Sequence, residues 1–385
     1  MQLEDLRQQI DDVDGQFCAL YLKRLALCEK VAEIKAQTNA PVYQAAREAQ
    51  VLERVRVRFP EAYAPAAENL YRVIMRQSRD MQRRRMGGGA PTGHHAPTGH
   101  PRPVGAPPPA VAAQGIPGAY SHEAAEKLFQ SPRIVSLRTF EAVFRAVEKG
   151  LCEYGVVPIE NSTYGSVTKV YDLLALHDLV ILQGYRLPIR HSLLSKAKSV
   201  KAIKRLYSHE QAIGQCAGLI EKLGKEVELI PTENTAVAAR MAAEDGEEAA
   251  ALSSAKCAQL FGLNILRKDV QDMADNETRF LTIGKAGSSL LPDLRAESLP
   301  VISTCFRLRN EPGTLSAMLE IPASLGANIL KLEHRPFPDN AYGVRFFLDL
   351  AAGMESPGIY GMLEEMAAAS VEFKILGAYK VFADG

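Results

Sequence analysis

Three short motifs in the middle of the chain combine hydroxyl, acidic and cationic side chains. Tyr-Ser-His-Glu occurs twice, at residues 120–123 and 207–210, and Thr278-Arg279-Phe280 follows an Asp-Asn-Glu turn. Each Tyr-Ser-His-Glu leads into an alanine-rich helical run, so its serine, Ser121 or Ser208, is placed to cap a helix N-terminus. Two such N-termini could face one dianionic ligand. The motifs therefore predict an enzyme site, although two ordinary caps with a coincidental sequence would look the same.

A second set of polar residues, close to the N-terminus, could line an anion pocket. Arg24 and Lys35 are eleven residues apart, almost a whole number of helical turns, so both point to the same side. Ser78 and Gln82 are neighbours at i and i+4. Arg7 would lie ~25 Å from Arg24 along one helix, so a partner subunit would have to supply it to the same ligand. The alternative is that these cations are solvated surface residues.

The elements that position this second set are helical. Apolar residues recur every three or four positions from Leu3 to Ile34 with no proline before Pro41, which predicts one helix over residues 3–38. At ~1.5 Å per residue this helix is ~54 Å long and needs a partner to bury its apolar stripe. Shorter helices are predicted over residues 44–58 and 62–85. An intertwined dimer is the natural arrangement for three helices of these lengths.

Composition excludes several classes of protein. The 385 residues are 47% hydrophobic and carry 45 basic and 45 acidic side chains, which predicts neither nucleic acid nor a membrane as a partner. The six cysteines are scattered singly and predict reduced thiols in a cytoplasmic protein, with no disulfide frame and no metal site. The N-terminus is acidic and amphipathic, unlike a secretion signal.

The composition changes sharply between Gly87 and Pro109, where Gly, Pro, Ala, Thr and His dominate and APTGH occurs twice. A segment without apolar periodicity predicts a linker, here residues 87–109, after a helical domain over residues 1–86. Its histidines, His94, His95 and His100, have no carboxylate or cysteine nearby, so no physiological metal site is expected.

Beyond the linker, short apolar runs alternate with helical stretches, which predicts an α/β domain over residues 110–286. Strands are expected at residues 151–158, 180–182, 205–207, 227–230, 249–252 and 280–283, and helices at 124–129, 140–149, 212–223, 235–243 and 257–261. Residues 298–382 predict strand 301–308, helix 314–325, strands 329–334 and 344–350, helix 358–368 and strand 373–382. This βαββαβ order is typical of an α+β ferredoxin-like domain.

The N-terminal pattern resembles the all-helical chorismate mutase domain. The matching residues are Leu6-Arg7, Ile10, Arg24, Lys35, Pro41-Val42, Arg47-Glu48, Ser78 and Gln82. The resemblance implies that Arg7 from the other subunit, Arg24 and Arg47 hold the two carboxylates of chorismate. It also implies that Lys35 and Gln82 donate to the ether oxygen, that Glu48 and Gln44 hold the hydroxyl, and that Ser78 lines the pocket. Gln44 stands where the family usually has an acidic residue.

The later segments resemble prephenate dehydratase. The matching motifs are Gln114-Gly115, Gly118, Tyr120-Ser121, residues 157–162 (Val-Pro-Ile-Glu-Asn-Ser), Tyr207-Ser208-His209, Gln211, residues 232–235 (Thr-Glu-Asn-Thr) and Thr278-Arg279-Phe280. The resemblance implies two lobes around a cleft, like a periplasmic binding protein, with Thr278 as the proton donor and Glu160 or Glu233 assisting. The other substrate contacts that it implies are Ser121, Asn161, Ser208, Gln211, Gln215 and Arg279.

Residues 298–382 resemble an ACT regulatory domain, with residues 313–316 (Gly-Thr-Leu-Ser) and 333–336 (Glu-His-Arg-Pro) in place of its phenylalanine-site motifs. The resemblance implies phenylalanine as an allosteric effector, held by Gly313, Thr314, Leu315, Asn328, Glu333 and Arg335. The ordinary alternative is that residues 333–336 form only a strand end with a satisfied ion pair.

The domain order is that of the bifunctional chorismate mutase/prephenate dehydratases of phenylalanine biosynthesis. The resemblance implies that chorismate is converted to prephenate and prephenate to phenylpyruvate without a cofactor, in a homodimer or higher homo-oligomer. Two rival hypotheses remain at this point. One is a dehydratase acting on arogenate, with the helical domain as an assembly arm. The other is a catalytically inert ligand sensor, which would not need Thr278.

Overall fold

The structure is a computed structural model that describes residues 3–38, 40, 42, 44–86, 107–288, 298–336, 343–353 and 358–383. Residues 87–106 of the predicted linker, including its three histidines, lie outside the described residues. The chain forms two compact units. The first unit contains residues 1–95, 308–329 and 354–372, and the second contains residues 96–307, 330–353 and 373–385.

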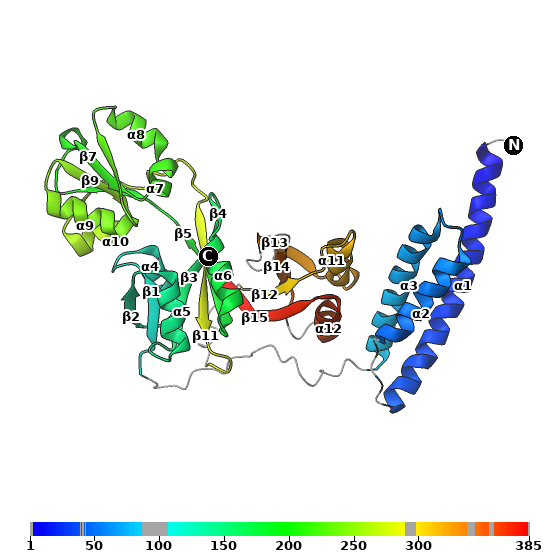
Figure 1. Cartoon of the computed structure of the whole chain (residues 1–385). Helices are drawn as coiled ribbons and strands as arrows, with labels where there is room; N and C mark the ends of the chain where they lie inside the picture. Colours follow the sequence, from blue (N-terminus) through cyan, green and yellow to red (C-terminus); the bar gives the residue numbers. More distant parts are fainter. Residues whose placement is uncertain are drawn as a thin grey trace. The chain divides into compact units, whose positions relative to one another are not determined.

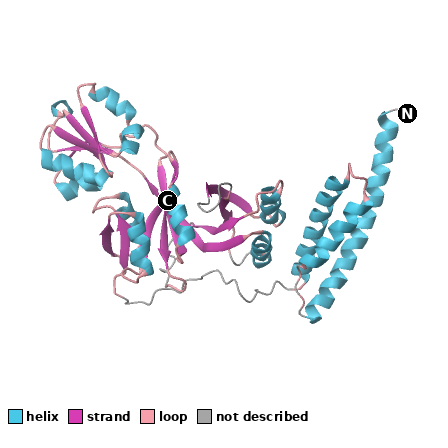
Figure 2. Cartoon of the chain, viewed as in Figure 1, coloured by secondary structure: helices cyan, strands magenta, loops and turns pink. Residues whose placement is uncertain are grey.

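The N-terminal region is wholly helical, as predicted (Figure 2). Helix α1 (Leu3–Thr38) has Glu4 and Asp5 in its first turn and Lys35 in its last, the charge order that the helix dipole favours. Helices α2 (Ala45–Arg58) and α3 (Ala64–Arg85) follow, and α3 packs against both of the others. Within one chain, Ala32 is the buried residue of α1, whereas apolar side chains from Leu3 to Ile34 are exposed.

The first α/β lobe is built on a mixed sheet. Its strands lie in the order β5-β11-β3-β1-β2, with a short strand, β4, paired to β3. Their bounds are β1 (Ala110–Gln114), β2 (Arg133–Leu137), β3 (Tyr154–Asn161), β4 (Gly165–Ser166), β5 (Val180–Pro188) and β11 (Glu277–Gly284), and the helices are α4 (Tyr120–Leu128), α5 (Phe140–Glu148) and α6 (Thr168–Leu176). Val111 and Ala112, adjacent on β1, belong to different apolar clusters, so both faces of the sheet are covered.

The second lobe has its own sheet, in the order β10-β6-β9-β7-β8. The strands are β6 (Ser192–Ser195), β7 (Arg205–Ser208), β8 (Glu228–Pro231), β9 (Ala249–Ser253) and β10 (Asn264–Arg267). The helices are η1 (Val200–Ala202), α7 (Glu210–Gln215), α8 (Ala217–Leu223), α9 (Thr235–Asp245) and α10 (Ala255–Phe261). The chain enters this lobe between β5 and β6 and returns between β10 and β11 (Figure 1). The predicted two-lobed α/β fold is thereby confirmed.

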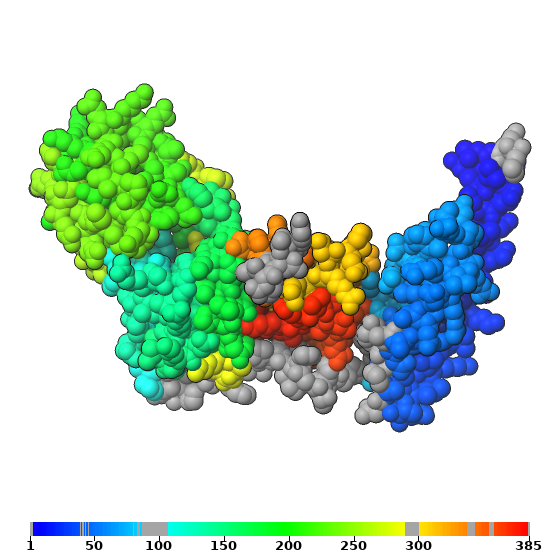
Figure 3. Space-filling view, in the orientation of Figure 1, coloured from blue at the N-terminus to red at the C-terminus, as the bar shows by residue number. Residues whose placement is uncertain are grey.

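The C-terminal segment follows the predicted βαββαβ order. It consists of β12 (Ser298–Arg307), α11 (Thr314–Ser324), β13 (Asn328–Pro336), β14 (Val344–Ala351), α12 (Ile359–Ala369) and β15 (Glu372–Ala383). Its strands lie in the order β13-β14-β12-β15, and β15 pairs in parallel with β5, where Val381 is opposite Gly184. The C-terminal strands thus extend the sheet of the first lobe, and β15 (red in Figure 3) lies against that lobe.

Local expectations about the two serine motifs were wrong. Neither Ser121 nor Ser208 caps a helix, because Ala119 is the N-cap of α4 and His209 is the N-cap of α7. Ser208 ends β7, and its hydroxyl donates to the carbonyl of Leu252 on β9 at 3.0 Å, so it holds two strands together instead. The predicted helix over residues 212–223 is interrupted at Cys216, which gives α7 and α8. Helix α6 and strands β1, β2, β4, β6 and β10 were not expected from the sequence.

Candidate active sites

The helical region brings several of the predicted chorismate-binding residues together. Arg24 Nη1 on α1 donates to Ser78 Oγ on α3, and this hydroxyl in turn donates to the Ile74 carbonyl at 2.7 Å. Ser78 and Gln82 are 4% and 7% exposed, and Gln82 Oε1 has no hydrogen-bond partner in the described chain. A buried acceptor without a partner is costly, so Gln82 Oε1 is available to a donor group of a ligand.

Lys35 and Glu48 belong to the same site. Lys35 Nζ donates to the Val42 carbonyl at 2.7 Å. Burial lowers the pKa of Lys35, while the nearby Glu48 and Cys28 oppose this shift. Glu48 accepts a hydrogen bond from Arg79, which also pairs with Glu365 of α12. The site therefore combines two cations, a carboxylate and two neutral polar side chains, all from helices α1, α2 and α3.

For three other predicted mutase residues, the described structure records no side-chain contact with this cluster. Arg7 is on the same uninterrupted helix as Arg24 but ~25 Å away along its axis, and its Nη1 pairs with Glu4 at 3.5 Å. Arg47 is exposed and donates to Gln50 at 3.5 Å. Gln44 is exposed at the N-cap of α2 and makes no side-chain capping hydrogen bond. Of the three arginines predicted to hold the two carboxylates, Arg24 is thus the one that the described part of a single chain places in this cluster.

The second candidate site is centred on Thr278 at the start of β11. Thr278 is 8% exposed, and its Oγ1 lies 3.0 Å from Nδ2 of Asn161, the last residue of β3. The two residues are directly opposite each other in the antiparallel β3–β11 pair. Asn161 Nδ2 also reaches Asn276 Oδ1 at 2.8 Å, and Asn161 Oδ1 accepts from the main-chain N–H groups of Thr163 and Tyr164 at 3.0 Å. Because the amide donates to Thr278, the threonine proton is free to point at a ligand.

The turn after β3 connects this site to the second lobe. Tyr164 Oη donates to the main-chain carbonyl of Gln211 in α7 at 3.0 Å. Gln215 is at the end of the same helix, and its Oε1 accepts a hydrogen bond from His191 Nε2 at 2.8 Å. His191 lies in the segment between β5 and β6, and its Nδ1 is 3.0 Å from Tyr120 Oη of α4. Thus Gln211 and Gln215 lie where the two lobes meet.

No motif or spacing in the sequence singled out His191. It is 2% exposed, and burial lowers its pKa, an effect that the hydrogen bond with Gln215 partly offsets. A lone histidine between two strands carries no spacing signal, so this residue could be found only from the structure. His191 thus contacts Tyr120 of the first lobe and Gln215 of the second.

The remaining predicted dehydratase residues are placed as follows. Ser121 is buried in the first turn of α4, and Ser208 is fully buried, with its proton committed to Leu252. Glu233 is exposed just before α9, whose N-cap Asn234 accepts from Val237 N at 2.9 Å. Part of the Thr-Glu-Asn-Thr motif is therefore an ordinary helix cap.

Glu160 and Arg279 are not brought together with Thr278. Successive side chains of a strand point to opposite faces, and Glu160 and Arg279 are paired in register one position away from the Asn161–Thr278 pair. Arg279 Nε lies 2.8 Å from Glu160 Oε1 on that opposite face. The expectation that Glu160 assists Thr278 directly, or that Arg279 contacts the same substrate, does not fit this geometry.

The predicted effector residues fall into two groups. Gly313 is the N-cap of α11 with a left-handed φ of 84°, and Thr314 and Leu315 begin that helix. On β13, Glu333 accepts from Ser166, and Arg335 Nη2 pairs with Asp172 Oδ2 at 3.0 Å, so both side chains contact the first lobe. Asn328 is exposed at the start of β13.

Within the described ranges, no group of three or more His, Cys, Asp or Glu side chains could hold a metal ion. Among the same residues, no helix is both long and apolar enough to cross a membrane.

Comparison with known proteins assigns a family to each of the two regions that contain these sites. The family model for chorismate mutase type II matches residues 6–83, and the model for prephenate dehydratase matches residues 111–288. A bifunctional chorismate mutase/prephenate dehydratase of Aquifex aeolicus (strain VF5) is 31% identical over an alignment of 384 residues, and the match covers 98% of each chain.

Two solved structures are similar to the later part of the chain, each with a TM-score of 0.64. One is described as GqqA, a novel type of quorum quenching acylase; it is 30% identical, and the match covers 71% of this chain and 98% of that one. The other is prephenate dehydratase from Arthrobacter aurescens in complex with L-Phe, which is 25% identical; the match covers 70% of this chain and 89% of that one.

Proposed function

The chain belongs to the bifunctional chorismate mutase/prephenate dehydratases and is therefore both an isomerase and a lyase, and we propose that its two reactions take place at the two sites described above, one at each. The helical site would convert chorismate to prephenate, and the site at Thr278 would convert prephenate to phenylpyruvate. The observation that carries the second assignment is the Asn161–Thr278 hydrogen bond, which leaves a threonine proton free.

The first reaction is a unimolecular rearrangement, so its catalyst must fold the substrate and stabilise charge that develops on the ether oxygen. Lys35 and the side-chain NH2 group of Gln82 are the donors for that oxygen, and Arg24 holds one carboxylate. Glu48 holds the substrate hydroxyl, with Gln44 and Ser78 beside it. Arg47 and an Arg7 from a second subunit complete the carboxylate contacts. The exposed apolar stripe of α1 supports this dimer, since a partner helix would cover it.

The second reaction removes the ring carboxylate as CO2 while the ring hydroxyl departs. The electron pair of the breaking C–C bond enters the ring, which becomes aromatic, and a proton from Thr278 converts the leaving hydroxide to water. Solvent then returns a proton to Thr278. Threonine is a weak acid, so the transfer takes place late, when the C–O bond is already largely broken. Asn161 orients Thr278, and Ser121, Gln211, Gln215 and the exposed Glu233 are proposed to surround the substrate, with Ser208 supporting β7 from behind.

Incubation of the purified chain with chorismate tests both assignments. Prephenate should form first and phenylpyruvate second, with no added cofactor. Prephenate and arogenate supplied separately then distinguish the substrates of the lyase, and arogenate as the sole substrate would contradict the proposal. Failure to form either product would favour the catalytically inert ligand sensor.

We propose further that residues 298–382 form an ACT domain of ferredoxin-like fold, and that phenylalanine binds there as a feedback inhibitor. The strand order β13-β14-β12-β15 supports this fold. The loop at Gly313 supports the binding site, because a glycine with φ of 84° at the N-terminus of α11 lets the main chain approach a carboxylate closely. Thr314, Leu315 and Asn328 belong to the same proposed site. The relative from Arthrobacter aurescens was solved with L-Phe, which makes this amino acid the first ligand to test.

Calorimetry with phenylalanine tests the effector site. Gly313→Val should abolish binding because a β-branched residue cannot adopt this backbone conformation without strain, whereas Gly313→Asn, which tolerates it better, should retain binding. Equal binding by the intact protein and the valine variant would contradict the proposal.

The proposed assembly is a homodimer or higher homo-oligomer, and the proposed location is the cytoplasm. All six cysteines are free, as expected for a reducing compartment. Light scattering of the purified protein tests the assembly, and a monomer that is active as a mutase would contradict it.

A further inference from the structure

The back of the catalytic strand, on the face opposite Thr278, carries a buried set of charges. Arg279 is 7% exposed, although a guanidinium is strongly hydrated and is rarely buried without partners. It follows Thr278 directly on β11, and its register partner Glu160 precedes Asn161 on β3. Any displacement of Arg279 or Glu160 is therefore transmitted to the hydrogen-bonded pair on the front face through one peptide bond.

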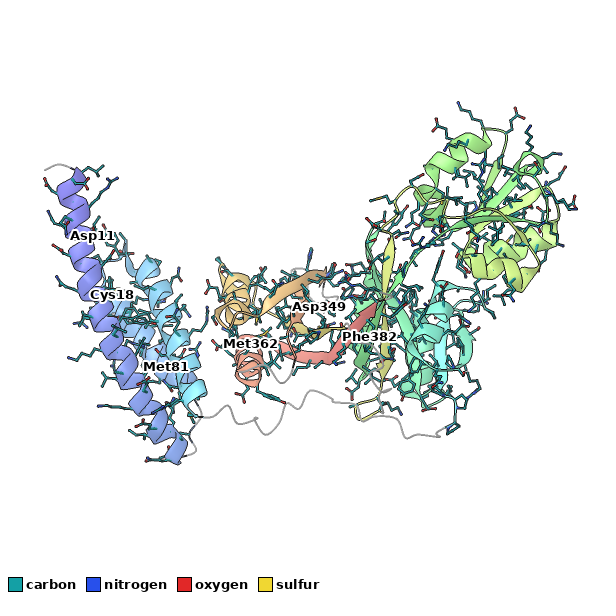
Figure 4. The ribbon with its side chains drawn as sticks, turned by 180° about the vertical axis from the view of Figure 1, so that it is seen from behind. Asp11, Cys18, Met81, Asp349, Met362 and Phe382 are labelled. Atoms are coloured by element: carbon teal, nitrogen blue, oxygen red, sulfur yellow. The ribbon has the colours of Figure 1, made fainter. Side chains whose placement is uncertain are left out.

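The C-terminal strands supply the main partner of Arg279. Its Nη2 lies 2.6 Å from Oδ2 of Asp349 on β14, a carboxylate that is 7% exposed (Asp349 is labelled in Figure 4). The other oxygen, Asp349 Oδ1, accepts from Ser303 Oγ of β12 at 2.5 Å, and Ser303 Oγ lies 2.9 Å from Tyr379 Oη of β15. Asp349 is thus fixed from two further strands of the C-terminal segment.

The second carboxylate is also held from the C-terminal side. Glu160 accepts a hydrogen bond from Lys331 of β13. Burial alone would raise the pKa of Glu160, but Arg279 and Lys331 outweigh it and keep that pKa below its usual value. The set of Arg279, Lys331, Glu160 and Asp349 is neutral, with one cation and one anion from the C-terminal strands. Removal of one member would leave a buried charge without compensation, which is far more costly than the loss of an exposed pair.

We propose that Asp349 is a positioning residue for the dehydratase: it fixes Arg279 on the back of β11 and thereby fixes Thr278 and Asn161 on the front. This inference rests on the proposed role of Thr278. It assigns the C-terminal segment a part in the basal reaction, in the absence of any effector. The family resemblance implies instead that Arg279 contacts the substrate, where it would anchor a carboxylate. That role would involve no residue of β14.

The two readings predict different kinetics for prephenate. Asp349→Asn keeps the size of the side chain and removes its charge, so we expect kcat to fall about 10- to 100-fold with KM little changed, as for a misplaced catalytic group. Arg279→Gln should have the same signature. The double variant should lose little more than the worse single variant, since both substitutions break one contact. An anchoring role for Arg279 predicts instead a raised KM in Arg279→Gln and normal kinetics in Asp349→Asn.

Two controls keep the test decisive. Asp172→Asn removes another carboxylate of the first lobe, one that pairs with Arg335 of β13. No hydrogen bond or ion pair joins Asp172 to β11 in the described structure, so the basal kcat of this variant should stay normal. Mutase activity, measured in the same samples, reports the concentration of chains, and thermal unfolding reports whether the α/β lobes are folded. If Asp349→Asn does not fold, Ser303→Ala, which removes only one hydrogen bond to Asp349, decides the question through a smaller fall in kcat at constant KM.

The outcomes separate this inference from the assignment on which it rests. If Thr278→Ala is inactive and Asp349→Asn has a normal kcat, the role of Asp349 is overturned and that of Thr278 stands. Where Asp349→Asn does not fold, a normal kcat in Ser303→Ala has the same meaning. An active Thr278→Ala overturns the assignment of Thr278 and this inference with it.

Discussion

At the scale of single residues, the dehydratase site depends on the direction of one hydrogen bond. Asn161 Nδ2 donates to Thr278 Oγ1 at 3.0 Å, while Asn161 Oδ1 is held by two main-chain N–H groups, so the amide cannot turn round without losing them. The threonine oxygen is thereby an acceptor within the protein, and its proton remains for the substrate.

Asn161→Asp should reverse this arrangement. A carboxylate has no proton to give, so it would accept the proton of Thr278 and withdraw it from the substrate. We expect the dehydratase kcat to fall by about 10²–10³-fold, the loss typical of one catalytic donor. Steady-state kinetics with prephenate measures it, and Asn161→Ala, which does not capture the proton, should be less impaired. A normal kcat in Asn161→Asp would show that the orientation of the amide is unimportant.

Buried histidines should make the dehydratase lobes sensitive to acid. The pKa of His191 lies below the ordinary value of 6.5 because burial disfavours its charged form, and burial lowers the pKa values of His122 and His209 in the same way. The unfolded chain therefore binds more protons than the folded chain as the pH falls through 6.5. Stability is full above that pH and is lost progressively until the pH reaches the folded-state pKa.

Thermal unfolding between about pH 7.5 and about pH 5 measures this loss. His191→Gln should unfold with a weaker pH dependence than the parent chain, although not with none, because His122 and the partly buried His209 remain. His334→Gln, at an exposed position of β13, is the matched control. Identical pH dependence in His191→Gln and in the parent chain would exclude His191 as a source of the effect.

The residue scale is also where prediction from sequence was weakest. The resemblance to prephenate dehydratase proposed Thr278 and Asn161, which lie opposite each other in the structure, yet it assigned Glu160 and Arg279 to the same pocket. Alternation along a strand would have separated them, had the strand been placed from residue 277 and not from residue 280. His191 could not have been found at all, because its partners Tyr120 and Gln215 are distant in sequence and meet only in the folded lobes.

At the scale of elements, helix α1 leaves most of its apolar side chains exposed in a single chain. It is 36 residues long, and its apolar stripe is exposed in a single chain. Helical periodicity predicted this helix and its two neighbours closely, since a long amphipathic repeat is the strongest signal that a sequence carries. Short strands such as β6 and β10 were not expected, because four residues are too few to show alternation.

Mixing of subunits tests whether Arg7 acts across a dimer. Arg7→Ala and Arg24→Ala should each inactivate the mutase. After exchange of subunits, one of the two sites in each mixed dimer has both arginines, so roughly a quarter to a half of the activity should return. Exchange is verified by mass spectrometry of differently tagged chains. If activity does not return, the two residues belong to one chain's site or to none.

The junction between β15 and β5 should be intolerant of added atoms. A Cβ at Gly377 would lie 2.3 Å from the carbonyl oxygen of Ile181, whereas at Gly184 its nearest neighbour is a Val381 methyl group at 3.1 Å. Gly377→Ala should therefore destabilise the chain by about 1–3 kcal/mol, and Gly184→Ala by less, because a side chain yields more easily than a backbone. Thermal unfolding ranks the two variants, and equal stability of both with the parent chain would contradict the close packing of β15 on β5.

At the scale of the whole molecule, one chain carries two reactions in sequence. The helical site and the α/β site use different elements and share no side chain among the residues described here, so the two activities should be separable by substitution. The helical region and the α/β region could be predicted because composition and periodicity change across residues 87–109, and the two lobes because of the resemblance to prephenate dehydratase. The extension of the first lobe's sheet by the C-terminal strands could not be predicted, since pairing between β5 and β15 leaves no mark in either sequence.

The most direct test of this account is Thr278→Ala supplied with chorismate at neutral pH. Prephenate should accumulate at the parent rate, while phenylpyruvate formation falls by at least about 10²-fold, and Thr278→Ser, which keeps the hydroxyl, should recover much of it. Following both products in one reaction makes the mutase an internal control for the amount of chain, and thermal unfolding checks that the α/β lobes remain folded. Phenylpyruvate formed by Thr278→Ala at the parent rate would contradict the central claim that this hydroxyl supplies the proton for the dehydration.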